Sequence, residues 1–182
     1  MTTLRVGQHP GVVHHPRVLP AAVRVWAALA GLGFGLIALG VGSGHVGPHP
    51  VVGAVDVGIG LAATAWALAA LRGPRALGSR PAVALAVAAP VILLSAPIAG
   101  VLPTAAEASA LALGTFSAVL AALAIRLGPE PADPPAGRQA AALAVGALLV
   151  ATLTVPGLAA TNAGEHAVPH GSHGLPAEQH HH

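Results

Sequence analysis

The chain of 182 residues has no cysteine, no lysine and only one methionine, and charged or aromatic side chains are scarce. Without cysteine it cannot form a disulfide, a thiolate metal site, an iron–sulfur cluster or a cysteine nucleophile. A relay of methionine sulfurs for copper(I) is also excluded, because Met1 is the only methionine. Charged residues make up 8% of the chain. Soluble domains carry about 25%, so this composition excludes a soluble globular domain.

The small positive balance of the chain does not point to nucleic acid. Eight arginines and six acidic residues give a formal net charge of +2. Nucleic-acid-binding domains concentrate basic residues in a patch, often with aromatic side chains between them, and this pattern is missing. The phosphate-binding glycine loop with lysine, HExxH and GxSxG are missing too. We therefore expect no nucleic-acid partner and no hydrolase of these known types.

Apolar residues are abundant, at 54% of the chain, and they gather in five long runs. The runs cover residues 21–41, 51–71, 82–102, 108–127 and 139–160. A helix that spans a bilayer needs about 20 mainly apolar residues, and each run has that length. None has the polar face of a soluble amphipathic helix. The sequence therefore predicts an all-α polytopic integral membrane protein, a bundle of five transmembrane helices, with the lipid bilayer as its surroundings.

The arginines predict which way the bundle faces. They lie before or at the start of the first run, between the second and third, and beside the connection between the fourth and fifth: Arg5, Arg17, Arg24, Arg72, Arg75, Arg80, Arg126 and Arg138. With five helices, all of these regions fall on one side. Because basic residues are retained in the cytoplasm, we expect a cytoplasmic segment 1–20, a transmembrane domain 21–160 and an extracytoplasmic tail 161–182 in the cell membrane.

Small and aromatic residues indicate how the helices pack. Gly31 and Gly35 stand in GxxxG spacing in the first run, and the second run carries several glycines, including Gly60. Small residues let helices approach closely in lipid, so we expect packing within the chain, with a homo-oligomer or a membrane partner as the alternative. Trp26 and Trp66 lie near the predicted cytoplasmic interface, where we expect them to act as anchors.

Histidine is the one abundant polar residue, and eight of the eleven copies fall on the predicted outer side. His45 and His49 precede the second run, in a predicted loop, and His166, His170 and His173 lie in the tail. Imidazole is a good ligand for zinc, copper, nickel and iron. The final three histidines have the form of a purification tag, so we exclude them from the predicted site.

Asp56 is a carboxylate a turn or two inside the second apolar run. A carboxylate in hydrocarbon is costly and normally faces a partner or water. If the helix extends to His49, the two residues share a face but are two turns apart, too far to be neighbours, and His45 or a tail histidine can lie between them. Glu107, at the outer end of the fourth run, can add a second carboxylate. Pairing with another helix and proton transfer are the alternative roles for Asp56.

One short stretch resembles a known motif. His49, Pro50, Gly53 and Asp56 resemble the HP-x-x-G-x-D-H motif of the HupE/UreJ nickel and cobalt membrane proteins over eight residues. The aspartate is displaced by one position, and Val57 follows it where the motif has histidine. No ligand assignment follows from this resemblance.

The sequence thus predicts a protein that handles a divalent transition metal, copper or zinc, in uptake, delivery or assembly. The predicted ligands are His45, His49, Asp56, His166, His170 and His173. The first alternative is a membrane-embedded metalloenzyme, in which the same cluster holds a metal with an open coordination position. The second is a non-catalytic accessory subunit of a larger membrane complex, which the scarcity of polar residues inside the helices favours.

Overall fold

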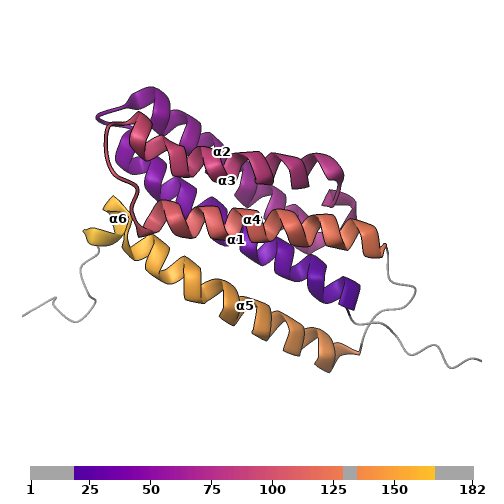
Figure 1. Cartoon of the computed structure of the whole chain (residues 1–182). Coiled ribbons are helices and arrows are strands. Elements are labelled where there is room, and N and C mark those ends of the chain that lie inside the picture. The colour runs from indigo at the N-terminus through magenta and orange to yellow at the C-terminus, as the bar shows by residue number, and fades with distance from the viewer. Residues whose placement is uncertain (1–18, 129–134, 167–182) are drawn as a thin grey trace, which may run out of the picture.

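The computed structural model describes residues 19–128 and 135–166, and within these ranges the chain forms helices and no strand. Five long helices run in alternating directions along the bundle (Figure 1). They are α1 (Leu19–His45), α2 (Pro50–Arg72), α3 (Ser79–Ile98), α4 (Ala105–Leu127) and α5 (Ala136–Ala159). The short helix η1 (Pro74–Ala76) joins α2 to α3, and α6 (Asn162–Glu165) follows α5. The predicted all-α bundle of five long helices is confirmed.

All five long helices have the length and hydropathy of membrane spans. Their outer surfaces carry many large apolar side chains that no other part of the described chain covers, among them Leu61, Val87 and Leu148. Helices that are apolar on all sides belong in lipid when the protein is too small to bury them. The chain is therefore a multi-pass membrane protein.

Two helix ends differ from the sequence prediction. His45 lies in the last turn of α1, where the prediction had a loop. In the other direction, α3 stops at Ile98, four residues short of the predicted end. Gly100 adopts a φ of 75°, and the N–H of Val101 donates to the carbonyl of Ala96 at 3.0 Å. This is the Schellman ending, which needs a left-handed residue and is most easily made by glycine.

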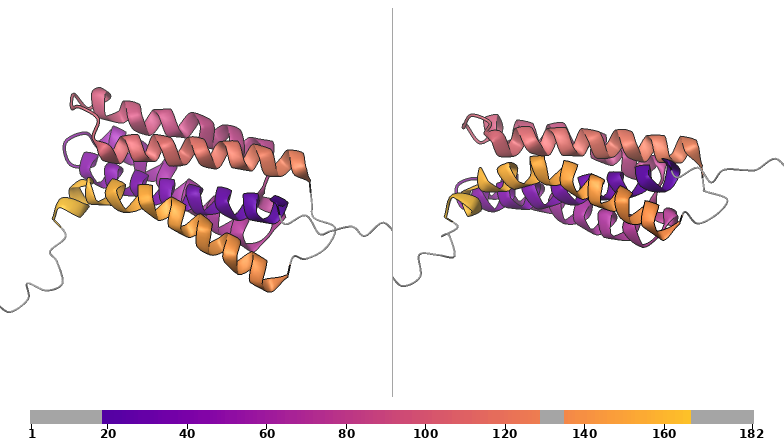
Figure 2. Two further views of the ribbon diagram at one scale, coloured as in Figure 1. Left: turned by 60° about the horizontal axis from the view of Figure 1, so that its bottom comes forward. Right: turned by 90° about the horizontal axis from the view of Figure 1, so that it is seen from below.

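The helix α1 is the centre of the bundle. It packs against α2, α4 and α5, and its Phe34 and Ile37 are fully buried. The helix α3 packs chiefly on α4 and makes little contact with α2, its predecessor in the chain. Figure 2 shows α5 running along the outside of the bundle. The chain is thus organised around its first helix, and a space separates α2 from α3.

Glycines allow α1 and α2 to come into backbone contact. A Cβ atom placed on Gly60 would lie 2.8 Å from the carbonyl oxygen of Gly35, and one on Gly35 would lie 2.9 Å from that of Gly60. Gly42 and Gly53 make similar approaches nearer the end of the hairpin. Such contacts are the main source of helix association in lipid, where apolar side chains gain little from leaving the solvent. The glycines therefore pack within the chain, as the sequence analysis favoured.

Both tryptophans use their indole N–H groups inside the protein. Trp26 donates from Nε1 to the carbonyl of Ala142 at 2.6 Å and so joins α1 to α5. Trp66 donates to the carbonyl of Ala76 at 3.0 Å and ties η1 to α2. The expected role as interfacial anchors is therefore supplemented by a direct role in holding segments of the chain together.

The two ends of the bundle differ in chemistry. The six arginines of the described chain all lie at the end where α1 and α5 begin, which we call the arginine end (Figure 1). The opposite end, called the histidine end, contains the α1–α2 and α3–α4 connections and α6. His45, His49, Asp56 and Glu107 lie at or near this second end.

We expect Gly60→Ala to lower the free energy of unfolding by about 1–3 kcal/mol, because the new methyl group meets backbone that cannot rotate away. Gly58→Ala is the matched control, since a Cβ at Gly58 meets nothing within 4 Å. It should be neutral or slightly stabilising. Thermal unfolding of both variants in detergent, followed by circular dichroism, measures the difference. Equal stability of the two variants would contradict the proposed backbone contact.

Candidate functional site

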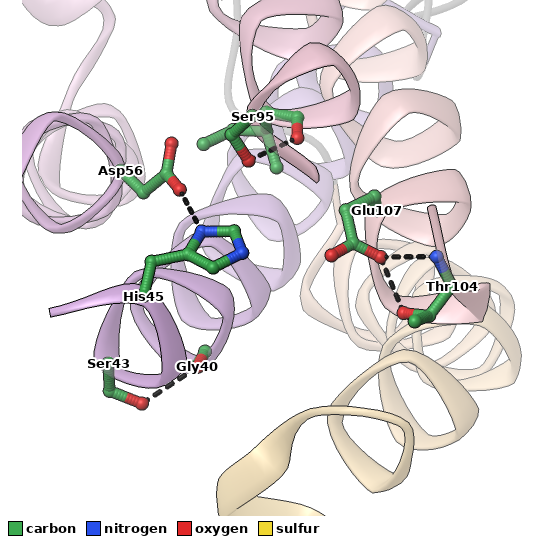
Figure 3. A network of polar contacts seen from close by, with 8 residues as sticks. Gly40, Ser43, His45, Asp56, Ser95, Thr104 and Glu107 are labelled. Carbon is green, nitrogen blue, oxygen red and sulfur yellow. Dashed lines mark hydrogen bonds and ion pairs between the residues drawn. The ribbon is translucent and has the colours of Figure 1, made fainter. Parts of the chain in front are cut away.

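The α1–α2 hairpin brings His45 and Asp56 together. Nδ1 of His45 and Oδ2 of Asp56 are 2.9 Å apart (Figure 3). Two glycines beside the pair permit this: a Cβ on Gly42 would lie 2.9 Å from Cβ of Asp56, and one on Gly53 would overlap the backbone of Val46. Asp56 is thus paired with a residue of another helix, which is the arrangement that the sequence analysis gave as an alternative to a metal ligand.

Asp56 depends on this contact because it is completely buried. Its second oxygen, Oδ1, has no hydrogen-bond partner within the described part of the chain. Ser95 of α3 lies across from it, but the serine hydroxyl donates to the carbonyl of Ile92 at 2.8 Å (Figure 3). When Nδ1 of His45 carries the proton that it donates to Asp56, Nε2 of a neutral ring is left with a free lone pair.

The free nitrogen of His45 faces a second carboxylate. Figure 3 shows Nε2 pointing toward Glu107, which lies in the first turn of α4. One oxygen of Glu107 closes the helix cap: Oε2 accepts from the backbone N–H of Thr104 at 2.7 Å and from its hydroxyl at 2.5 Å. The other oxygen lies on the side of His45 (Figure 3). The imidazole therefore stands between carboxylates from two other helices.

A cleft of about 230 Å3 opens beside this group. Its polar lining comes from the α1 end, the α3–α4 connection and the start of α6: His45, Thr104, Glu107, Thr161 and Asn162. Since a water molecule takes up about 30 Å3 in the liquid, the cleft has room for several waters or a hydrated ion. The side chain of His45 is 12% exposed and that of Asp56 is 1% exposed. His45 is therefore the member of the pair that the cleft can reach.

The remaining predicted site residues lie apart from this pair. His49 is the N-cap residue of α2, and its side chain makes no capping hydrogen bond. His166 is exposed at the end of α6, where Nδ1 donates to the carbonyl of Asn162 at 2.7 Å. His170 and His173 lie outside the described residues. Within residues 19–128 and 135–166, no three metal-ligating side chains come close enough to hold an ion by themselves.

Some residues of the site escaped the sequence analysis. Thr104 was missed, although the T-x-x-E spacing of Thr104 and Glu107 is the signature of a capping box and so could have been found. Ser95, Thr161 and Asn162 carry no such local signal, because only the packing of the helices brings Ser95 near Asp56 and the other two to the cleft. The assembled group can bind a cation at Nε2 or pass a proton between the cleft and the buried carboxylate.

Comparison with known proteins adds no assignment, since no protein-family model, curated protein or solved structure matches the chain.

We expect His45→Ala to cost about 1–3 kcal/mol of stability, because it leaves a buried carboxylate without the hydrogen bond that His45 donates. In a double-mutant cycle with Asp56→Ala, the double variant should lose less than the sum of the single losses, by at least 0.5 kcal/mol. His49→Ala is the control and should change stability by less than about 0.5 kcal/mol. Thermal unfolding in detergent measures all four variants. Additive losses would show that the pair does not contribute as a unit.

Proposed function

We propose that this protein binds a divalent transition metal, copper or zinc, at the histidine end and serves in its uptake, delivery or assembly. The observation that carries the proposal is the orientation of His45. Metal-ligating histidines almost always donate their second ring N–H to a carboxylate or carbonyl, which orients the ring and makes the ligating nitrogen more basic. Asp56 accepts such a bond from Nδ1, and Nε2 faces Glu107 beside an open cleft.

This proposal changes the role of Asp56. The sequence suggested a direct ligand, but Asp56 is completely buried behind the imidazole. We infer that it orients His45 instead, while Glu107 supplies the carboxylate ligand. Zinc sites have three or four protein ligands, so His45 and Glu107 alone are too few. The tail begins at α6, whose Asn162 lines the cleft, and we propose that His166, His170 and His173 complete the site.

We further propose that the protein lies in the cell membrane with its arginine end in the cytoplasm. All six arginines of the described chain gather at that end, as the retention of basic residues in the cytoplasm favours. In this orientation the cleft opens to the outside. Metal ions that arrive from outside would meet His49 at the rim of the bundle and His45 within the cleft.

One observation favours the accessory-subunit alternative. Helix α5 is mostly exposed: among its residues, all of which the structure describes, only Gly146 and Gly157 are buried. Leu148, Leu149 and Val155 of the same helix are exposed. Such a surface suits lipid and equally suits a helix of a partner protein. The metalloenzyme alternative uses the same His45 site with an open coordination position, and metal binding is its first requirement.

Metal analysis of full-length protein without a tag, purified in detergent, tests the proposal. We expect one tightly bound zinc or copper ion for each chain. Asp56→Asn should weaken the affinity about 10–100-fold, since loss of the carboxylate behind a ligating histidine has this effect. His45→Ala should weaken it at least as much. Calorimetric titration with each metal alone measures the affinities, and circular dichroism checks that the variants fold.

His49→Ala is the matched control, because it removes one imidazole at the same end without touching Asp56. We expect it to weaken binding less than His45→Ala does. Absence of bound metal would overturn both metal proposals and leave the accessory subunit. Weak binding of several ions, unchanged by His45→Ala and lost when residues 167–182 are deleted, would show that the tail alone binds metal.

The absence of cysteine makes the orientation simple to test. Gly47→Cys lies in the α1–α2 connection and Gly137→Cys at the start of α5, and a side chain at either position meets nothing within 4 Å. In intact cells, a membrane-impermeant maleimide should label Gly47→Cys and should label Gly137→Cys only after lysis. The reverse result would place the histidine end in the cytoplasm.

A further inference from the structure

An apolar groove of about 270 Å3 runs between α2 and α3. It exists because α2 packs on α1 and α3 packs on α4, so the two helices make little contact with each other. Trp66 and the fully buried Phe34 contribute aromatic rings to its wall, and small side chains such as Ala62, Ala84 and Ala88 leave the space open. The groove is open between two membrane-spanning helices, so a molecule that fills it has to enter from the hydrocarbon of the bilayer.

Two kinds of apolar occupant suit a groove in the membrane: a helix of a partner protein and a hydrocarbon chain of a lipid. A helix is about 10 Å across, whereas a single hydrocarbon chain is much thinner and can follow a narrow channel along two helices. The charge at the mouth of the groove favours the lipid.

Basic side chains line two hollows beside the arginine end of the groove. Arg80 directly precedes Pro81, which lines the groove, and it shares a surface hollow with Ala84, another groove residue. Arg72 and Arg75 line a second hollow together with Ala76. The hydrogen bond from Trp66 to the carbonyl of Ala76 connects this hollow to the groove wall. Three exposed arginines thus lie where an acyl chain in the groove would meet its headgroup.

These three charges are not neutralised by the helices that carry them. The sequence contains no acidic residue between Asp56 and Glu107, which are both at the opposite end of the bundle. Within residues 19–128 and 135–166, the one ion pair is that of His45 and Asp56. Within the described part of the chain, the groove mouth is therefore a site of positive charge that a phosphate group can complement.

We propose that the groove binds one anionic phospholipid, with an acyl chain between α2 and α3 and the phosphate at Arg72, Arg75 and Arg80. Guanidinium groups match phosphate oxygens in two-point hydrogen bonds, and basic pockets between spanning helices are known to take anionic headgroups. The bound lipid would fill the space between two helices that are otherwise held together chiefly through α1 and α4. This inference does not depend on the proposed metal site.

Quenching of Trp66 by brominated lipid tests the proposal. The full-length protein with Trp26→Phe, in which Trp66 is the only tryptophan, is placed in phosphatidylcholine vesicles. A minor fraction of the lipid is then replaced by phosphatidylglycerol or phosphatidylcholine with the same brominated chains. We expect the apparent affinity for phosphatidylglycerol to exceed that for phosphatidylcholine about fivefold or more. Equal quenching by the two lipids would overturn the proposal, because it indicates contact with bulk lipid only.

Two pairs of variants locate the lipid. Arg75→Gln with Arg80→Gln should remove most of the preference, while Arg126→Gln with Arg138→Gln should retain it, because neither of these last two lines the groove or the two hollows beside it. Ala84→Phe fills the groove and should reduce quenching by both lipids. Ala86→Phe, on an exposed neighbouring position that does not line the groove, should not. Equal effects within either pair would place the lipid elsewhere and contradict the proposal.

Discussion

In the apolar interior of a membrane, α1 and α2 are held together by direct contact between their backbones. Gly35 meets Gly60 in the middle of the hairpin, and Gly42 and Gly53 allow the same approach near its end. Lipid provides little hydrophobic drive for helix association, so short-range packing has to supply the attraction. The close approach of α1 and α2 also brings His45 and Asp56 of the candidate site into contact. With larger residues at Gly42 and Gly53, the hairpin would open and His45 could not meet Asp56.

Burial of the Asp56 carboxylate is the main electrostatic cost in the fold, and the contact with His45 offsets part of it. A fully buried carboxylate has one oxygen on an imidazole and the other without a partner in the described chain. Native proteins rarely leave such an atom unpaired, and where they do the position is often functional. The imbalance lies next to a polar cleft at one end of a bundle whose interior is otherwise made of alanine, glycine and a few large apolar residues. This contrast is the reason for placing the chemistry there.

The two ends of the molecule are suited to different ligands. At the histidine end, imidazole and carboxylate groups converge from three helices and favour a cation. At the arginine end, three exposed arginines line hollows beside an apolar groove and favour an anion with a hydrocarbon chain. Both arrangements follow from α1 holding α2 on one side and α4 on another. The hairpin with α2 builds the first site, and the separation of α2 from α3 builds the second.

Length, hydropathy and the position of the arginines were enough to determine five membrane-spanning helices and their alternating directions, because these properties are local or depend only on counting. The sequence also indicated that Asp56 needs a partner. It could not establish that His45, and not a histidine of the tail, lies against it. His49 lies at the start of the same helix, roughly 10 Å from Asp56 along the axis. His45 lies on the preceding helix, and the sequence does not predict the register in which the two helices of the hairpin pack. The sequence did not predict the groove either, because the five helices are similarly rich in alanine and their sequences do not indicate which of them pack together. Those choices depend on how glycines and large side chains fit across helices, and only the tertiary structure decides them.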